Sequence, residues 1–430
     1  MANLCDELED SLHPGTTENS MRSSSGGWKS ARLIIGVEMA EHFAFYGISS
    51  NLITYLTGPL GESTAAAAAN VNAWSGTVSF LPLLWGFIAD SFLGRFRTIL
   101  VASSLYILRV DHSFDLYIYS REPKLVLGIC TARGEKKNPF ARISHVFMEA
   151  VRNRGQPGLD IYYPNQTLLM VRVHDSKQLR AAISCDLAEI EEAKAVLKLV
   201  PIWMSCLVYA IVCAQSHTFF TKQGATMDRS ISPGLLVPVA TLQCFINLTI
   251  IIFIPIYDRL LVPIARSFTQ CPSGITMLQR IRSGMVLSIL AMVVAALVET
   301  KRLQTARDDA TTLMCVWWLV PQYVFIGVAD MLTMVGLQEL FYDQVPCELR
   351  SIGMALNLSI YGVGNFLSSF IISFIDKVTR QSGQTSWFDN DLDKAHLDYF
   401  YWLLACLGSI GLASYLWFAK SYVYNRPNKF

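Results

Sequence analysis

The stretch LMCVWWLVPQYVFIGVADMLTMVGLQELFY, from Leu313 to Tyr342, decides the fold class of this chain. Over this length only two residues carry a charge, Asp330 and Glu339. About 20 predominantly apolar residues in a helix are enough to cross the hydrocarbon core of a bilayer. The stretch therefore predicts a membrane-spanning helix that holds two acidic side chains.

Similar apolar blocks lie on both sides of this stretch. Of the whole chain, 52% of the residues are hydrophobic and 16% are charged, whereas a soluble globular chain averages about 25% charged residues. We therefore expect an all-α, multi-pass integral membrane protein in contact with the lipid bilayer. Further spans are expected near residues 33–60, 71–92, 196–216, 233–262, 282–298, 352–375 and 398–420.

Composition and charge exclude several other classes of protein. A net charge of +1 provides no field for nucleic acid. The 10 cysteines show no paired CxxC spacing, so no metal site is expected. The chain contains no nucleophile–base constellation, no HExxH and no glycine-rich phosphate loop, so we do not expect an enzyme.

The charge pattern divides the chain into four parts. Basic loops are cytoplasmic by the positive-inside rule, and the stretch 110–195 is rich in Lys and Arg. Three full spans before it would place it outside, whereas two spans and a short third segment keep it inside, and we favour the second count. The expected parts are a disordered cytoplasmic tail (1–27), a partial N-terminal lobe with two full helices and a short third (28–109), a cytoplasmic linker (110–195) and a six-helix C-terminal lobe (196–430).

The first apolar block contains three ionisable residues. Glu38, Glu41 and His42 have the i, i+3, i+4 spacing of one helical face, and Tyr46 lies one turn further. Ionisable groups at bilayer depth are costly unless they are paired or hydrated, and they often form proton relays. A hydrogen-bonded pair that only fixes packing is the alternative interpretation.

The segment GFIADSFLGRFRTI follows the second block and matches the G-x3-D-x3-G-R-x2-T loop of the major facilitator superfamily. Together with NVNAWSG (70–76), the stretch 321–346 and RSIGMALNLSIYGVGNFLSS (350–369), it makes the chain resemble the plant nitrate/peptide transporter family, in the proton-dependent oligopeptide transporter branch. The resemblance covers residues 27–109 and 135–430. It implies two six-helix lobes that move small solutes with protons by alternating access. The loop residues are Gly86, Asp90, Gly94, Arg95 and Thr98.

Two departures from the family stand out. Position 42 is histidine where the family motif ExxER has arginine, and histidine loses its proton near neutral pH. The resemblance also jumps from Leu108 to about Leu127, which omits most of the third helix and the fourth to sixth helices. The predicted fold is therefore a major facilitator-type transporter with a truncated N-terminal lobe and a complete six-helix C-terminal lobe.

The C-terminal lobe is expected to supply the other side of a substrate cavity. By resemblance, Asp330 occupies the place of the acidic group of the tenth helix. Gln322, Asp330 and Thr333 fall near one helical face and could line a water-filled path with Tyr46, while Tyr323 is either a pocket wall or an interfacial anchor. We place Gln338 and Glu339 nearer a cytoplasmic gate, with a structural pairing of Glu339 to a neighbouring helix as the alternative.

Two functions follow from these features. The first is a proton-coupled symporter of small solutes such as nitrate, peptides or other metabolites, which needs no cofactor besides the proton gradient. Cys213 aligns with a histidine of nitrate-carrying members, which disfavours nitrate. The second is a transport-inactive truncated isoform that acts as a partner of a full-length homologous transporter. A plasma membrane and a vacuolar membrane are both compatible with the sequence.

Overall fold

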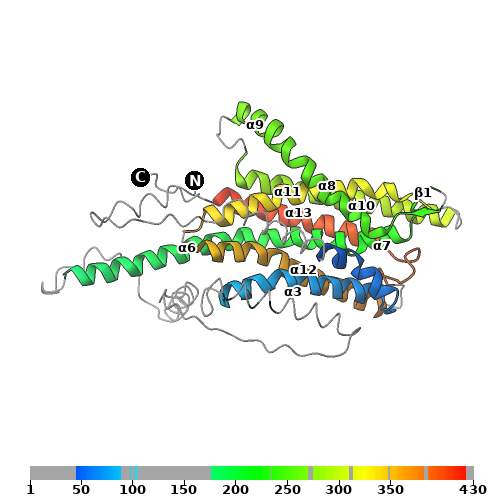
Figure 1. Ribbon diagram of the computed structural model, residues 1–430, viewed down its shortest axis with the longest axis horizontal. Coiled ribbons are helices and arrows are strands. Elements are labelled where there is room, and N and C mark those ends of the chain that lie inside the picture. The colour runs from blue at the N-terminus through cyan, green and yellow to red at the C-terminus, as the bar shows by residue number, and fades with distance from the viewer. Residues whose placement is uncertain are drawn as a thin grey trace. The chain divides into compact units, whose positions relative to one another are not determined.

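The computed structural model describes residues 45–88, 97, 101, 104, 176–232, 234–269, 275–308, 313–346, 349–381 and 386–422. Residues 45–57 are helical, and Phe45 and Tyr46 meet edge to face with ring centroids 5.5 Å apart. The remaining α-helices are α3 (Thr64–Ile88), α6 (Ser176–Cys213), α7 (Phe219–Ala225), α8 (Cys244–Ile256), α9 (Val262–Thr269), α10 (Met277–Asp308), α11 (Val320–Asp343), α12 (Arg350–Gln381) and α13 (Leu397–Ser421), as Figure 1 shows.

Short elements connect these helices. The 3-10 turns are η2 (Ala214–His217), η3 (Val239–Gln243) and η5 (Val316–Leu319), and a π-helical turn, η4 (Tyr257–Leu261), follows α8. The strands β1 (Ser230–Ser232) and β2 (Leu235–Leu236) form an antiparallel hairpin. Gly234 lies in its turn with φ of +89°, a backbone conformation that glycine adopts without steric cost.

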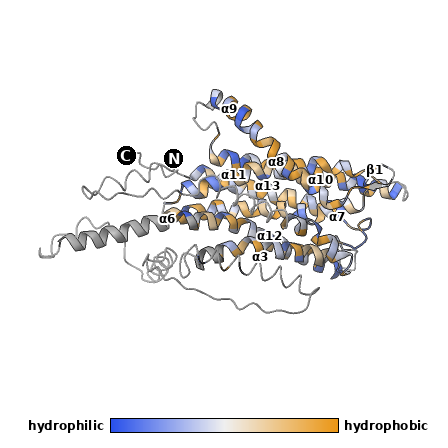
Figure 2. Cartoon of the chain, in the orientation of Figure 1, coloured by the Kyte–Doolittle hydropathy of each residue, from blue (hydrophilic) through white to orange (hydrophobic). Residues whose placement is uncertain are grey.

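Six segments within the described residues are long and apolar enough to cross a membrane, and Figure 2 colours the helices by the hydropathy of their residues. They confirm the six spans predicted for the C-terminal lobe. The segments are Ala195–Ala225, Val239–Ser267, Met277–Asp308, Val316–Asp343, Ile352–Gln381 and Leu397–Ser421. The domain boundaries expected near residues 27, 109 and 195 remain predictions.

Helix α3 packs along α12, as Figure 1 shows. A Cβ on Gly76 would lie 3.0 Å from the Gly362 carbonyl oxygen, so the absence of a side chain lets the two backbones approach closely. Asn72 Nδ2 on α3 donates a hydrogen bond of 2.9 Å to Ser368 Oγ on α12. The close approach at Gly76 and the bond from Asn72 to Ser368 therefore help to hold α3 against α12.

An aromatic cluster occupies the end of the lobe where α7 meets α13. Phe219 stacks on Phe388 with centroids 4.9 Å apart and meets Phe400 edge to face at 5.3 Å. All three side chains are fully buried. Because edge-to-face and offset stacks are the favoured aromatic geometries, this cluster fixes the segment before α13 against α7.

Candidate functional site

Asp330 lies in the middle of α11 and directs its carboxylate toward α6. The Tyr209 hydroxyl donates a hydrogen bond to Asp330 Oδ1 over 2.5 Å, and the Cys213 thiol lies 3.5 Å from the same atom. Tyr209 and Cys213 are four residues apart on α6, so they project from one face of that helix. Both side chains are buried.

The two donors to Asp330 are neutral groups. Among the described residues, no lysine, arginine or histidine forms an ion pair with Asp330. A carboxylate charge at this depth of a membrane protein is expensive unless it is compensated. A proton on the carboxyl, or a cationic group of a solute beside it, would supply that compensation.

The other α11 residues that we predicted to line the cavity contact different neighbouring helices. Gln322 Nε2 donates to Gln223 Oε1 on α7 over 3.2 Å. Tyr323 is fully buried and meets Phe220 edge to face. Thr333 is buried against α10, where a side chain at Gly284 would collide with it. The expected common face is thus divided among three neighbouring elements, and the cavity roles of these residues remain predictions.

Glu339 pairs with a neighbouring helix. Arg280 Nη1 on α10 donates to Glu339 Oε2 over 2.7 Å, and Arg280 Nε donates to Tyr257 Oη over 3.0 Å. Tyr257 is buried and belongs to the π-helical turn η4. This contact matches the structural pairing that we gave as the alternative for Glu339, while the gating roles of Glu339 and the exposed Gln338 remain predictions.

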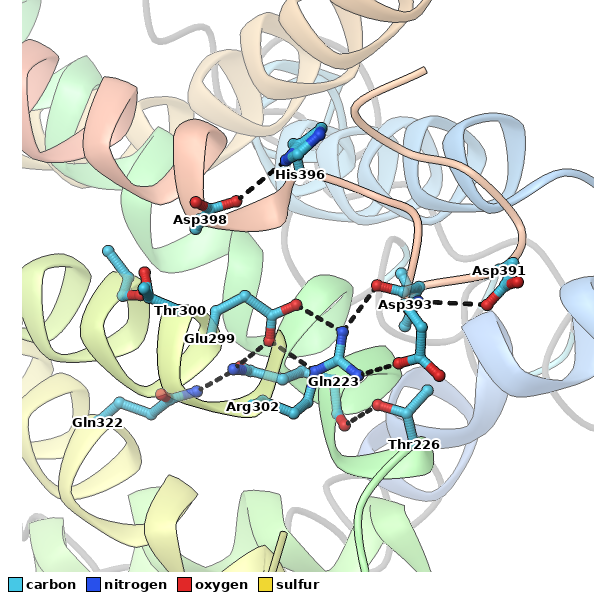
Figure 3. Close-up of polar contacts among 12 residues, drawn as sticks. Gln223, Thr226, Glu299, Thr300, Arg302, Gln322, Asp391, Asp393, His396 and Asp398 are labelled. Carbon is cyan, nitrogen blue, oxygen red and sulfur yellow. Dashed lines mark hydrogen bonds and ion pairs between the residues drawn. The ribbon is translucent and has the colours of Figure 1, made fainter. Parts of the chain in front are cut away.

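A second buried polar group, which we name the outer network, joins α7, α10, α11 and the segment before α13 (Figure 3). Arg302 makes two hydrogen bonds to Glu299, of 2.9 and 3.0 Å, and one of 2.5 Å to Asp393 Oδ1. Gln223 Nε2 donates to Glu299 Oε2 over 2.8 Å. Glu299 is fully buried. The network consists of Gln223, Glu299, Arg302, Gln322 and Asp393.

The outer network continues into an exposed pair in the same segment. Lys394 Nζ lies 3.0 Å from Asp391 Oδ2. The hydrogen bond from Lys394 lowers the pKa of the Asp391 carboxyl, and the same bond raises the pKa of Lys394. Because both side chains are largely solvated, this pair contributes little to stability.

Several predicted site residues lie outside the described residues. These are Glu38, Glu41 and His42 of the first block, and Asp90, Gly94, Arg95 and Thr98 of the loop motif. Gly86 belongs to the last turn of α3, and Tyr46 is partly exposed in the helical segment 45–57. Their predicted roles therefore remain predictions.

Sequence reasoning missed Tyr209 and the outer network. Nothing in the spacing of Tyr209 sets it apart from other aromatic residues of an apolar helix. A usable signal existed for Glu299 and Arg302, because two opposite charges at i, i+3 near the end of an apolar helix indicate an intrahelical pair. The link from Arg302 to Asp393, 91 positions away, is tertiary and leaves no local signal.

These helices define a multi-pass membrane protein with the fold of major facilitator-type transporters. The crystal structure of an auto-inhibited POT family peptide transporter aligns with a TM-score of 0.62 at 17% identity, over 93% of this chain and 99% of that chain. The POT family transporter PepTSo aligns with a TM-score of 0.59 at 16% identity, over 89% and 96% of the two chains. At these identities the likeness establishes the fold.

The family follows from the sequence comparisons. Residues 130–388 match the POT family. Protein NRT1/PTR FAMILY 5.11 of Arabidopsis thaliana is 58% identical, over 96% of this chain and 98% of the relative. NRT1/PTR FAMILY 5.10 of the same plant is 52% identical, over 95% of each chain. The chain belongs to the POT family, whose members are membrane transporters and not enzymes.

The same alignments show an internal deletion. The alignment with NRT1/PTR FAMILY 5.11 extends over 525 positions, whereas this chain has 430 residues, so at least 95 of those positions are gaps in this chain. Since the six spans from Ala195 onward are present, the loss lies in the N-terminal lobe. This finding agrees with the predicted truncation.

Proposed function

We propose that this chain acts as a proton-coupled symporter of small solutes, and that Asp330 is the acidic group of its C-terminal lobe that takes up either a proton or the cationic group of the solute. The observation that carries the proposal is the environment of Asp330, whose carboxylate is held by the neutral donors Tyr209 and Cys213. Such a site alternates between a charged and a neutral form more readily than a carboxylate fixed to an arginine.

The charge of this site bears on the class of solute. An ionised Asp330 repels an anion and attracts an ammonium group, and Cys213 adds no positive charge. Zwitterionic or cationic solutes therefore fit the site better than nitrate does. On the N-terminal side, Glu38, Glu41 and His42 are the proposed proton-coupling residues, and the proton gradient alone drives the cycle.

Uptake by the purified chain in liposomes with an imposed pH gradient tests this function. We expect proton-driven uptake of a dipeptide in preference to nitrate, and its loss in Asp330→Asn. Asp330→Glu, which keeps the acid, should retain part of the activity. Asp308→Asn, at an exposed position of α10, is the matched control and should leave uptake unchanged. Uptake by Asp330→Asn at the rate of the parent chain would contradict the role of Asp330.

A second candidate function is favoured by the deletion. Alternating access requires two lobes that move about a central site, and at least 95 positions of the relatives have no counterpart here. A chain that binds solute without transporting it could act as a partner of a full-length homologue. This candidate function requires two results. A full-length relative must co-purify with the tagged chain, and the chain alone must show no uptake.

A further inference from the structure

The two N-terminal helices meet the C-terminal lobe near its outer end. We name residues 49–88, which form two helices and the turn between them, the N-terminal hairpin. By the positive-inside rule, the end of α12 that begins at Arg350 faces the cytoplasm, so Asn390, in the segment that follows α12, lies on the outer side. Because consecutive spans alternate in direction, the span Ala195–Ala225 runs parallel to α12, and Lys222 near its end lies on the outer side too.

Asn390 caps the first turn of α3 from the other lobe. The first N–H groups of a helix have no partner within that helix. Thr64 is the first residue of α3, is 1% exposed, and its backbone N–H donates to Asn390 Oδ1 over 2.9 Å. The backbone N–H of Ala67, by contrast, donates to the Ser63 carbonyl oxygen over 2.9 Å. The Thr64 amide is therefore bonded across the two lobes, whereas the Ala67 amide is bonded within the hairpin.

Two further hydrogen bonds join the hairpin to the outer ends of the first two C-terminal spans. Lys222 Nζ of α7 donates to Thr57 Oγ1 over 3.0 Å. Ser50 Oγ donates to Gln243 Oε1 over 2.8 Å, and both of these side chains are buried. These contacts and that of Asn390 are hydrogen bonds and not ion pairs. Water can replace a hydrogen bond at a small net cost, so contacts of this kind can break and form again.

On α7, the residue that contacts the hairpin lies next to one that contacts the outer network. Gln223 follows Lys222 in the chain, and Gln223 Nε2 donates to Glu299 Oε2 of α10 over 2.8 Å. Adjacent residues of a helix point about 100° apart. One turn of α7 can therefore hold the hairpin on one side while it is fixed to α10 on the other.

The segment before α13 is fixed to α10 in the same way. Arg302 donates a hydrogen bond of 2.5 Å to Asp393 Oδ1, and its Nη2 donates to the Leu392 carbonyl oxygen over 2.7 Å (Figure 3). Asp393 lies three residues after Asn390, which caps α3. The buried ion pair of Arg302 with Glu299 thus anchors both of the segments that contact the hairpin through Asn390 and Lys222.

We propose that the outer network is the fixed base of an outer gate between the N-terminal hairpin and the C-terminal lobe. In the closed gate, Asn390 and Lys222 are held in position by this base and bind the hairpin. The gate opens when the hairpin moves away and these bonds are exchanged for bonds to water, while Glu299 and Arg302 stay paired. The gate does not depend on the proton-carrying role of Asp330.

Hydrogen–deuterium exchange of the full chain in phosphatidylcholine nanodiscs, resolved to single amides by mass spectrometry, tests the gate. The Thr64 amide reports the bond across the lobes, and the Ala67 amide reports the integrity of α3. We expect Asn390→Ala to speed exchange at Thr64 by about 5-fold, the equivalent of one typical hydrogen bond, and to leave Ala67 unchanged. Asp393→Ala, which keeps the buried ion pair of α10, should speed exchange at Thr64 by a similar factor.

Lys394→Ala is the matched control, because Lys394 lies in the same segment but pairs with the exposed Asp391. Exchange at Thr64 in this variant should equal that of the parent chain. The double variant Asn390→Ala with Asp393→Ala should exchange no faster than Asn390→Ala alone, because Asp393 acts through Asn390. Unchanged exchange at Thr64 in Asn390→Ala would overturn the gate. Unchanged exchange in Asp393→Ala, or additive effects in the double variant, would overturn the outer network as its base. Each of these results leaves the proposed function intact.

Discussion

Glu299 and Arg302 form a buried ion pair on α10, and we expect this pair to contribute strongly to the stability of the fold. Glu299 is fully buried and receives hydrogen bonds from Arg302 and Gln223. Removal of one partner from a buried ion pair leaves an uncompensated charge and typically costs about 3–5 kcal/mol. Glu299→Gln would leave Arg302 paired with Asp393, whereas Arg302→Met removes the cation that faces Glu299. We therefore expect Arg302→Met to lower the midpoint of thermal unfolding in detergent by far more than an average substitution does.

The exposed pair Asp391–Lys394 is the control for this prediction. Its side chains are 48% and 69% exposed, so Lys394→Ala should leave the midpoint of thermal unfolding almost unchanged. The double variant Glu299→Gln with Arg302→Met should be less destabilised than the sum of the two single variants, because it removes both buried charges. Strictly additive losses would show that the two residues act independently.

At the scale of the element, the sequence predicted the spans well and their contacts poorly. An apolar block such as 313–342 predicts a span from its length and composition, because the bilayer imposes both. The direction in which Gln322 or Thr333 points depends on which helix lies beside it. The residues nearby in the sequence do not specify that helix. The π-helical turn at Tyr257, which directs this tyrosine to Arg280, likewise has no simple sequence signal.

Helix α3 contacts α12 closely at Gly76. Gly76 lies against Gly362 and Phe366, and a Cβ at this position would come within 3.0 Å of the first and 3.1 Å of the second. A larger residue must push the helices apart, and overpacking of this kind costs about 1–3 kcal/mol. Gly76→Leu should therefore lower the thermal unfolding midpoint, whereas Thr77→Leu, at the exposed neighbouring position, should change it little. Equal shifts in the two variants would mean that α3 is not held by this contact.

The main feature of the whole molecule is that its N-terminal lobe is truncated while its C-terminal lobe has all six helices. The sequence predicted both the complete six-helix lobe and the loss on the N-terminal side, because the spans could be counted and the family motifs located. The roles of Glu38, Glu41 and His42 could not be checked in the same way, since they depend on helices that this chain lacks and on residues outside the described part. We therefore expect the deletion to influence transport more than any single substitution in the first block.

Insertion of the segment of NRT1/PTR FAMILY 5.11 that has no counterpart here should raise proton-driven uptake per molecule, because two lobes can then move about the central site. His42→Arg alone should not raise it, because an arginine in the first helix cannot replace absent helices. Both versions should lose uptake when Asp330 is changed to Asn. Uptake by the chain with the inserted segment and by the original chain is compared in liposomes at matched protein amounts. Equal uptake would show that the remaining helices suffice for alternating access.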